Sequence, residues 1–512
     1  MTTTGKPIAK VLVANRGEIA VRVMRTCREM GIRTVAVYSD ADRGSLHVRT
    51  ADEAVHIGPS PSRESYLVIE KIVDACKRTG ADAVHPGYGF LSEKATFARA
   101  LKDAKITFIG PPAESMDAMG VKTTARANMK RAGVPTVPGS EGPIADADEA
   151  KRYADSIGYP VMIKAAAGGG GKGMKKCERA EDFPTLWASA KRESGSAFMD
   201  DRLYVEKFLE KPRHVEIQVF ADEHGDAIWV GERECSVQRR QQKVIEESPS
   251  CILDEKMRQA MGEVAVRAAK AVGYRGAGTV EFLVDAHRNF YFLEMNTRLQ
   301  VEHPVTELTT GLDLVKLQIE VAQGGRIPRQ EQIVRRGHAI EARIYAEDPS
   351  KGFAPSPGRI NYLRIPSGPG VRDDSGVYGG WIVPQFYDPM LSKLLAWAPT
   401  REEAIAKLVR ALEEYIITGI TANVGYLARV LQHPAFRSGD YDTGFCAKYE
   451  RDLLPRNDPK HEMLAVVAAA ISAHTTDRAE AEAFAARSGQ SAATSRWVKL
   501  GRARQLRGGG SR

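Results

Sequence analysis

The stretch EMNTRLQVEH, residues 294–303, carries polar side chains at every second position. They are Glu294, Asn296, Arg298, Gln300 and Glu302. In an extended chain, alternate residues point to one face and lie roughly 6.7 Å apart. Glu294 and Asn296 can therefore approach one metal ion, whereas Glu302 lies up to about 20 Å beyond Asn296. The spacing predicts two adjoining subsites, one for a cation and one for another ligand. A half-exposed strand with a solvated face would give the same pattern.

A further carboxylate, Glu281, occurs in the apolar stretch GAGTVEFLVD. This stretch and NFYFLEMNTR are expected to pair as a hairpin around the polar turn AHRN. Glu281, Glu294 and the amide oxygen of Asn296 would then suit one or two magnesium ions that bridge nucleotide phosphates. Cross-strand polar pairing on an open face is the structural alternative.

The run GGGGKG, residues 168–173, follows the strand-like GYPVMIKAA. The run could be a linker, although linkers do not usually lie between an apolar strand and a further short strand. Backbone without side chains can wrap phosphate oxygens and donate N–H groups to them. The run is not a Walker A loop, because Gly173 stands where Ser or Thr would follow the lysine. Lys122 and Lys164 could add charge against phosphates, although lone lysines are usually surface residues.

The charge run SVQRRQQK contains Arg239, Arg240 and Lys243. Such runs are usually solvated, but beside a phosphate site this one would attract a small anion. A later stretch, GHAIEARIYAEDP, alternates in the same way as residues 294–303 and places Glu341, Arg343 and Tyr345 on one face.

The elements that must position these groups fall into two patterns. In the N-terminal part, strands such as KVLVA and TVAVYSD interleave with helical stretches such as IAVRVMRTCREM, which predicts a parallel α/β sheet with ligand groups at the strand ends. From about Gly120, mixed strands with few long helices predict an α+β fold. REEAIAKLVRALEEYII is expected to be an amphipathic helix, and an alanine-rich helical stretch and a basic tail follow Pro455.

Composition narrows the class of protein. The 512 residues are 43% hydrophobic and 27% charged, which is typical of a globular protein with more than one core. Residues 495–512 hold six basic groups and no acidic one. They account for most of the net charge of +8, so the rest of the chain is nearly neutral and a general nucleic-acid surface is not expected.

We expect no membrane span, no secretory signal and a cytoplasmic location. The six cysteines contain no CxxC pair and are expected to be reduced and buried.

Taken together, the chain resembles biotin carboxylase, a member of the ATP-grasp superfamily, over residues 7 to 452. Nine blocks in order carry the resemblance: ANRGEIAVR, HPGYGFLSE, FIGP, GYPVMIKAAAGGGGKGM, EKFLEKPRHVEIQV, ERECSVQRRQQK, GTVEFL, EMNTRLQVEHPVTE and GHAIEARIYAEDP.

The resemblance implies four parts of the chain. Residues 7–120 would form an α/β N-terminal domain with a Rossmann-like parallel sheet, the pre-ATP-grasp fold. Residues 121–335 would form the α+β ATP-grasp domain, with a mobile lid over about 136–208. Residues 336–452 would form an α+β C-terminal biotin carboxylase domain, and 453–512 a partly helical basic tail.

The resemblance also implies roles for single residues. It places ATP against Lys122, Lys164, Met174, Glu206, Lys207, Leu209, His214, Gln238 and Leu283. It places the phosphates under the glycine loop made of Gly168, Gly169, Gly170, Gly171, Lys172 and Gly173. It implies magnesium ligands at Glu281 and Glu294 with Asn296 beside them, bicarbonate at Lys243, Arg298, Gln300 and Val301, the general base at Glu302, an enolate-stabilising group at Arg343, and the biotin ring near Tyr88.

The implied reaction is the phosphorylation of bicarbonate by ATP to carboxyphosphate, followed by carboxylation of biotin. Two magnesium ions, or manganese in their place, would assist phosphoryl transfer. Another ATP-grasp ligase, joining a carboxylate to an amine, and a nucleotide-binding scaffold without turnover are the alternatives; QVEHPVTE together with Arg343 argues against the first, and the retained carboxylates argue against the second.

The chain contains no Ala-Met-Lys-Met biotinylation motif. We therefore expect biotin to arrive on a separate carrier protein or biotinylated subunit, and a carboxyltransferase subunit to choose an acyl-CoA or other acceptor. The resemblance also implies a homodimer, with no nucleic acid and no membrane as partners. The tail is predicted to help dock a partner; a disordered basic extension is the alternative.

Overall fold

The structure is a computed structural model that describes residues 7–166, 173–455, 463–464, 466–475 and 477–478, without the side chains of Lys122 and Thr123. The chain divides into two units, Met1–Leu454 and Pro455–Arg512. In the second unit, the described residues from 463 to 475 are helical, as predicted for the alanine-rich stretch.

The N-terminal part is built on a five-stranded parallel sheet in the order β3-β2-β1-β4-β5. Its strands are β1 (Lys10–Val13), β2 (Arg33–Ser39), β3 (Glu53–Gly58), β4 (Ala83–His85) and β5 (Thr107–Phe108). Its helices are α1 (Gly17–Glu29), α2 (Leu46–Thr50), α3 (Ile69–Thr79) and α4 (Ala95–Asp103). Val11, Leu12 and Val13 are completely buried, because packed side chains cover both faces of a parallel sheet. The predicted α/β fold is confirmed.

A small antiparallel sheet with strand order β7-β6-β8 follows two connecting helices. The helices are α5 (Ala113–Gly120) and α6 (Lys122–Arg131), and the sheet contains β6 (Val161–Ala165), β7 (Met174–Cys177) and β8 (Leu203–Lys207). Helices α7 (Ala147–Ile157) and α8 (Phe183–Phe198) pack against it. The predicted glycine run joins β6 to β7; residues 168–172 of that run lie outside the described residues.

The largest sheet has eight strands in the order β13-β12-β9-β10-β11-β14-β21-β19. They are β9 (Arg213–Ala221), β10 (Ala227–Arg239), β11 (Gln242–Ser248), β12 (Gly276–Val284), β13 (Phe290–Asn296), β14 (His338–Tyr345), β19 (Val371–Ser375) and β21 (Met390–Ala398). Strands β12 and β13 form the predicted hairpin, and its register sets Glu281 directly opposite Glu294. The α+β prediction for this part is confirmed.

This sheet crosses the boundary predicted between residues 335 and 336. Strand β11 pairs with β14, where Ile245 lies opposite Ala342 and Ser248 opposite Ala339. One hydrophobic core contains Ile245 of β11, Ile340 of β14 and Leu394 of β21. The predicted domain boundaries stay predictions, but the strands on the two sides of residue 335 belong to one continuous sheet.

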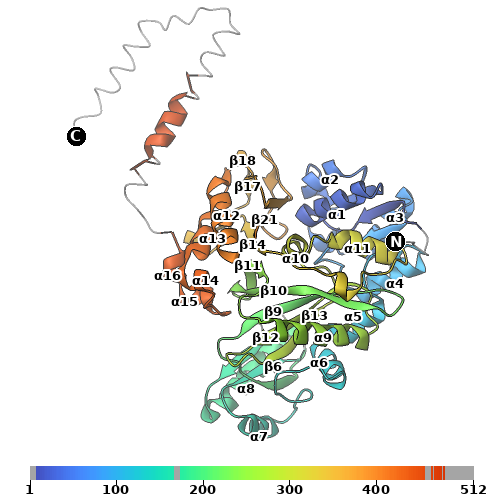
Figure 1. Cartoon of the computed structure of the whole chain (residues 1–512), viewed down its shortest axis with the longest axis vertical. Coiled ribbons are helices and arrows are strands. Elements are labelled where there is room, and N and C mark those ends of the chain that lie inside the picture. Colours follow the sequence, from blue (N-terminus) through green and yellow to red (C-terminus); the bar gives the residue numbers. More distant parts are fainter. Residues whose placement is uncertain (1–6, 167–172, 456–462, 465, 476, 479–512) are drawn as a thin grey trace, which may run out of the picture. The chain divides into compact units, whose positions relative to one another are not determined.

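Helices cover this sheet and connect it to the parallel sheet. Helix α9 (Glu255–Ala271) packs on β9 and β10, α10 (His303–Thr310) packs on β14 and β10, and α11 (Leu314–Ala322) packs on β12 and α1 (Figure 1). The remaining helices are α12 (Arg401–Glu414), α13 (Val424–Gln432), α14 (Pro434–Ser438), α15 (Phe445–Lys448) and α16 (Glu450–Leu453). The short strands are β15 (Glu347–Asp348), β16 (Ala354–Pro355), β17 (Gly358–Arg359), β18 (Tyr362–Arg364), β20 (Ile382–Val383) and β22 (Ile416–Thr418).

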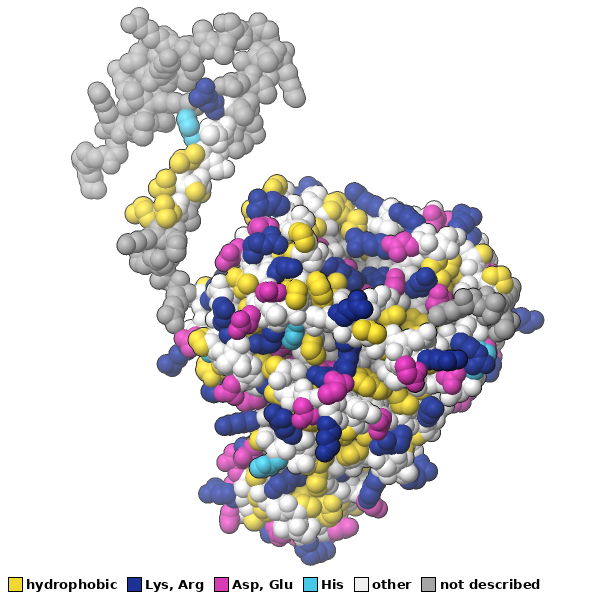
Figure 2. Space-filling view, in the orientation of Figure 1, with side chains coloured by type: hydrophobic (Ala, Val, Ile, Leu, Met, Phe, Trp, Pro, Cys, Tyr) yellow, Lys and Arg dark blue, Asp and Glu magenta, His cyan; other side chains and the backbone are white. Residues whose placement is uncertain are grey.

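The surface agrees with the predicted charge distribution. Figure 2 shows Lys and Arg side chains interspersed with Asp and Glu on the visible face of the first unit. Among the described residues, no helix combines the length and apolar character needed to span a bilayer. All six cysteines are free thiols; the prediction that they are buried is wrong for Cys251, which lies in an exposed loop beyond β11 where Arg213 contacts its sulfur at 3.2 Å.

Candidate active site

One cavity of about 1360 Å³ gathers the predicted site residues from several elements. The predicted residues that line it are Tyr88, Lys164, Met174, Glu206, Lys207, Leu209, His214, Gln238, Lys243, Glu281, Leu283, Glu294, Asn296, Arg298, Gln300, Val301, Glu302 and Arg343. Gly173 is described but is not among the described residues that line the cavity; its N–H donates to Glu193 at 3.3 Å. The side chain of Lys122 and residues Gly168, Gly169, Gly170, Gly171 and Lys172 lie outside the described residues.

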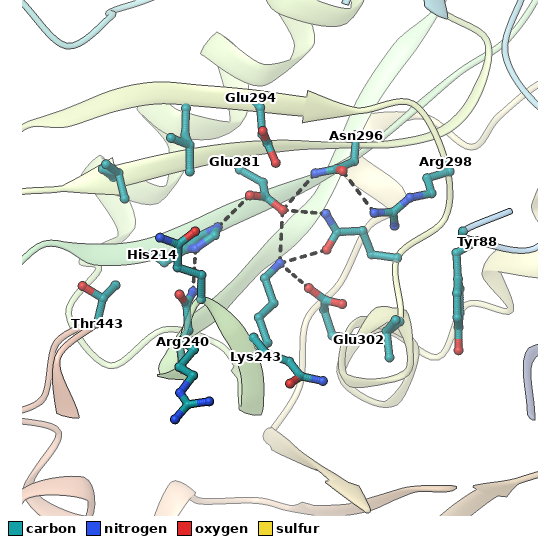
Figure 3. A pocket seen from close by; sticks show the side chains of 18 of the residues that line it. Tyr88, His214, Arg240, Lys243, Glu281, Glu294, Asn296, Arg298, Glu302 and Thr443 are labelled. Carbon is teal, nitrogen blue, oxygen red and sulfur yellow. Dashed lines mark hydrogen bonds and ion pairs between the residues drawn. The ribbon is translucent and has the colours of Figure 1, made fainter. Parts of the chain in front are cut away.

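Lys243, at the start of β11, lies at the centre of this cavity (Figure 3). Its ammonium group is 2.5 Å from Glu302 Oε1, 2.7 Å from Glu216 Oε2 and 3.1 Å from both Glu281 Oε1 and Gln300 Oε1. Burial by itself would lower the pKa of Lys243, but the surrounding anionic groups raise it well above its ordinary value. The positively charged Lys243 therefore contacts both predicted subsites, through Glu281 in the first and Glu302 in the second.

The hairpin β12–β13 supplies the predicted cation subsite. Glu281 and Glu294 face the same space from neighbouring strands, with Asn296 at the end of β13 (Figure 3). Two carboxylates and an amide oxygen are the hard ligands that magnesium prefers, so the donor set fits this ion. Glu281 also accepts hydrogen bonds from Asn296 at 2.9 Å and Gln300 at 2.7 Å, and its second oxygen lies 2.9 Å from His214 Nε2.

The expectation of one extended strand from Glu294 to Glu302 is wrong. Strand β13 ends at Asn296, the chain then turns, and Glu302 occupies the N-cap position of α10. The N–H of Thr297 donates to Glu93 Oε1 at 3.0 Å, and Leu299 is completely buried. Polar and apolar residues still alternate after Asn296, because a segment that turns can also bury every second side chain. The turn brings Glu302 to the same lysine that contacts Glu281, closer than an extended chain allows.

Arg298 lies at the edge of the predicted anion subsite. Its Nε donates to Glu93 Oε2 at 2.9 Å and its Nη2 to Asn296 Oδ1 at 3.1 Å. Glu93 was not predicted from the sequence, although it lies in the quoted block HPGYGFLSE. Val301 is anchored through its carbonyl, which accepts a hydrogen bond at 2.9 Å from the fully buried Lys393.

Glu302 is held between two cations. Its Oε1 contacts Lys243, and its Oε2 accepts from Arg343 Nη2 at 2.9 Å. The same Nη2 also contacts Glu246, on the neighbouring strand β11. Burial would raise the pKa of the Glu302 carboxyl, but Lys243, Arg343 and Arg233 together hold that pKa well below its usual range. Glu302 is therefore an anion at neutral pH, as a general base requires.

Two buried residues that were not predicted help to hold Lys243 in place: Glu216 contacts its ammonium group, and Arg233 contacts Glu216. Arg233 on β10 and Glu216 on β9 are both completely buried, and Arg233 Nε lies 2.5 Å from Glu216 Oε1. Arg233 also reaches Gln218 at 2.8 Å and Thr279 at 3.0 Å. The alternation of His214, Glu216 and Gln218 along the sequence was the available signal, but it could not show that Glu216 faces a lysine.

The far end of the cavity contains the residues predicted for the nucleotide. Glu206 on β8 contacts Arg126 and lies 2.5 Å from Lys164 Nζ on β6. Lys207 donates to the carbonyls of Gly158 and Tyr159 at 2.9 and 3.0 Å. Apolar side chains of Met174, Leu209 and Leu283 line the same space.

His214 connects this end of the cavity to the carboxylates. Its Nδ1 lies 2.8 Å from Gln238 Nε2, and its Nε2 faces Glu281. Burial would lower the pKa of His214, but the Glu281 carboxylate raises it above its ordinary value.

Two further predicted groups lie at the margins of the site. The hydroxyl of Tyr88 is buried and, among the described residues, has no hydrogen-bond partner. In the predicted charge run, Arg240 lines the cavity at the tight β10–β11 turn, whereas Arg239 is turned to Glu347 at 3.1 Å and stacks on Phe353. Of the basic residues in the charge run, Arg240 and Lys243 therefore line the cavity and Arg239 does not.

Comparison with known proteins identifies the family of the chain. Three family models match the chain: "Biotin carboxylase, N-terminal domain" over residues 7–116, "Carbamoyl-phosphate synthase L chain, ATP binding domain" over 121–330, and "Biotin carboxylase C-terminal domain" over 341–448.

Two relatives are carboxylases by name. Biotin carboxylase 1 of Bacillus subtilis is 52% identical over 445 residues, which cover 86% of this chain and 99% of that protein. The propionyl-CoA carboxylase alpha chain of Ruegeria pomeroyi is 52% identical over 487 residues, which cover 91% of this chain and 72% of that protein.

A solved structure shares the fold as well. The biotin carboxylase domain of Hydrogenobacter thermophilus 2-oxoglutarate carboxylase, a dimer in complex with MgADP, ADP and bicarbonate, is 45% identical with a TM-score of 0.83, covering 88% of this chain and all of that one. The chain belongs to the biotin carboxylase family of ATP-dependent ligases.

Proposed function

We propose that this chain uses ATP and bicarbonate to carboxylate biotin that is attached to a separate carrier protein, with the residue roles predicted from the sequence. One observation carries the proposal: the anionic carboxylate of Glu302 is held between Lys243 and Arg343, in the cavity that also contains the Glu281–Glu294 pair. A base for bicarbonate and a cation subsite for nucleotide phosphates thus lie next to each other.

Glu302 is the general base. In the resting site its proton affinity is too low for efficient catalysis, because Lys243 and Arg343 stabilise the anion. A bicarbonate anion that accepts hydrogen bonds from Lys243 and Arg298 competes with Glu302 for those cations. Loss of part of this stabilisation raises the pKa of Glu302 while the substrate is bound, so that the carboxylate takes the bicarbonate proton.

The nucleotide residues orient the γ-phosphate toward bicarbonate. Lys164, which contacts Glu206, offers a positive charge to the phosphates. Glu281 and Glu294, with Asn296, would hold magnesium, which neutralises charge on the transferred phosphoryl group. The small sheet β7-β6-β8 would close as a lid and exclude water, which protects carboxyphosphate from hydrolysis.

Partners follow from the reaction. We propose a biotinylated carrier protein or subunit and a carboxyltransferase subunit, and an acyl-CoA as the final acceptor, as the name of the Ruegeria pomeroyi relative suggests. We also propose a homodimer, since the related Hydrogenobacter thermophilus domain is described as a dimer.

The substitution Glu302→Gln tests the base. We expect carboxylation of free biotin with labelled bicarbonate to fall at least about 100-fold, because a general base contributes that much or more. ATP binding, measured by calorimetry, should change little, since Glu302 contacts Lys243 and Arg343 rather than the Glu206 end of the cavity. The exposed Glu413→Gln is the matched control. Turnover by Glu302→Gln comparable to that of the wild type would exclude Glu302 as the base.

The alternative enzyme is an ATP-grasp ligase that joins a carboxylate to an amine. It needs no bicarbonate and no biotin, so stimulation of ATP hydrolysis by biotin separates the two activities. We expect biotin to stimulate ATP hydrolysis only when bicarbonate is present. Equal hydrolysis with and without biotin, together with stimulation by an amine, would favour the alternative.

A further inference from the structure

Tyr345 lies in the active-site cavity and has no role in the proposed function so far. It is the last residue of β14, two positions beyond Arg343, and both residues line the same cavity. Tyr345 is 4% exposed and lines the cavity. Arg343, Gln242 and Asp388 line the same cavity and are the polar and charged neighbours of Tyr345. The ring is therefore placed where a ligand of Arg343 would also meet a phenolic oxygen.

A single buried side chain fixes the backbone of both residues. Asn423, which is 2% exposed, accepts a hydrogen bond from the Tyr345 N–H at 2.8 Å and donates to the Arg343 carbonyl at 3.0 Å. The Asn423 N–H in turn donates to the Tyr345 carbonyl at 3.1 Å. Arg343 and Tyr345 are consequently held as a pair, and such preorganisation is what donors to a developing charge require.

The chemistry of the two groups is complementary. The Arg343 guanidinium is already engaged by Glu302 and Glu246, so only part of its donor capacity remains for a substrate. Burial raises the pKa of Tyr345 to about 12 although Arg343 opposes the shift, so the hydroxyl keeps its proton at neutral pH and can donate it in a hydrogen bond. A neutral donor beside a cation suits an oxygen that gains negative charge.

We propose that Tyr345 is a further catalytic residue, whose hydroxyl donates a hydrogen bond beside Arg343 to the ureido oxygen of biotin. This inference rests on the proposed function, because it requires biotin to be the substrate at Arg343. Two donors then face the oxygen on which charge accumulates in the enolate form, and the step that uses biotin depends on Tyr345. The phosphorylation of bicarbonate does not, because the proposed hydrogen bond is made to biotin alone.

The variant Tyr345→Phe tests this proposal, since it removes the hydroxyl and keeps the ring. We expect kcat for carboxylation of free biotin, measured with labelled bicarbonate, to fall roughly 10- to 100-fold, which is at or below the loss seen for a single oxyanion donor. The slow ATP hydrolysis that needs bicarbonate but no biotin should stay within about twofold of the wild type, because the lost hydrogen bond is made only when biotin is bound. The KM for ATP should not change.

The control is Tyr426→Phe, which removes a buried hydroxyl from the core of the same region, away from the cavity lining. Both variants should melt at similar temperatures, and Tyr426→Phe should carboxylate biotin at the wild-type rate. The inference is overturned if Tyr345→Phe carboxylates biotin as fast as the control, or if it loses biotin carboxylation and biotin-independent ATP hydrolysis in the same proportion. A wild-type protein that carboxylates no biotin would instead refute the proposed function itself.

Discussion

Single residues show how burial and charge set proton affinities in this protein. In the cavity, cations hold the pKa of Glu302 below its usual range. In β19, the pKa of Asp373 is shifted in the opposite direction: burial raises the pKa of its carboxyl to about 7, and the Ser392 hydrogen bond and Arg25 oppose that shift. Asp374 and Glu18 add to the increase. A carboxyl group is thus an anion at Glu302 and largely protonated at pH 6 at Asp373.

The raised pKa of Asp373 predicts a pH-dependent stability. The folded protein binds a proton between about pH 4 and 7 that the unfolded chain releases, so this contribution is complete below about pH 4 and is lost as the pH rises through 7. Asn resembles the protonated acid, and Asp373→Asn should be more stable than the wild type above pH 7, by up to about 4 kcal/mol. Urea unfolding at pH 5 and pH 8 measures the difference.

The exposed Asp440→Asn serves as the control and should follow the wild type at both pH values. If Asp373→Asn loses as much stability between pH 5 and pH 8 as the wild type does, the carboxyl of Asp373 does not titrate in this range.

At the scale of elements, loops determine how closely the strands and helices pack against one another. The loop after β19 packs against the first residues of α1: a Cβ on Gly376 would lie 2.6 Å from the backbone nitrogen of Glu18 and 2.8 Å from the carbonyl carbon of Gly17. Backbone atoms cannot rotate away as a side chain can. This glycine therefore allows the start of α1, which lines the cavity through Gly17 and Glu18, to lie against the C-terminal strands.

The substitution Gly376→Ala should consequently destabilise the protein by about 1–3 kcal/mol, the usual cost of overpacking. It should also reduce biotin carboxylation, because the beginning of α1 must move. Differential scanning calorimetry and the labelled-bicarbonate assay measure the two effects. Gly120→Ala is the matched control, since a Cβ there meets no atom within 4 Å. Equal melting temperatures for the two variants would show that the loop adapts freely.

The sequence predicted elements better than the contacts between them. The hairpin β12–β13 and the helix α12 were predicted from periodicity, and the register then paired Glu281 with Glu294. The turn after Asn296 was missed, because period-two alternation is the same in a strand and in a turning segment with buried Leu299. Glu216 and Arg233 were missed for another reason: their partners are distant in sequence, and only the folded sheet brings them to Lys243.

At the scale of the whole chain, the described structure separates a catalytic unit from a C-terminal segment. Every described residue that lines the active-site cavity lies before Leu454, within the first unit. Because the second unit contributes none of these residues, activity toward free biotin should not depend on it. Its predicted role is the docking of a partner.

Deletion of residues 456–512 tests that separation. We expect the shortened chain to carboxylate free biotin at the rate of the full chain and to melt at the same temperature. If the segment docks a partner, copurification of the carrier or carboxyltransferase subunit should fall. Unchanged copurification would refute docking, and a loss of activity toward free biotin would show that the tail belongs to the catalytic unit.

The continuous eight-stranded sheet has a consequence for synthesis of the protein on the ribosome. Strand β11 ends at Ser248, and its neighbour β14 begins only at His338. At roughly 5–20 residues per second, about 5 to 18 s pass before the partner strand is made. During that time β11 presents an open edge, a surface that favours pairing with other nascent chains. We expect slowed translation after residue 248 to lower the yield of native enzyme, and chaperones that shield nascent strands to restore it.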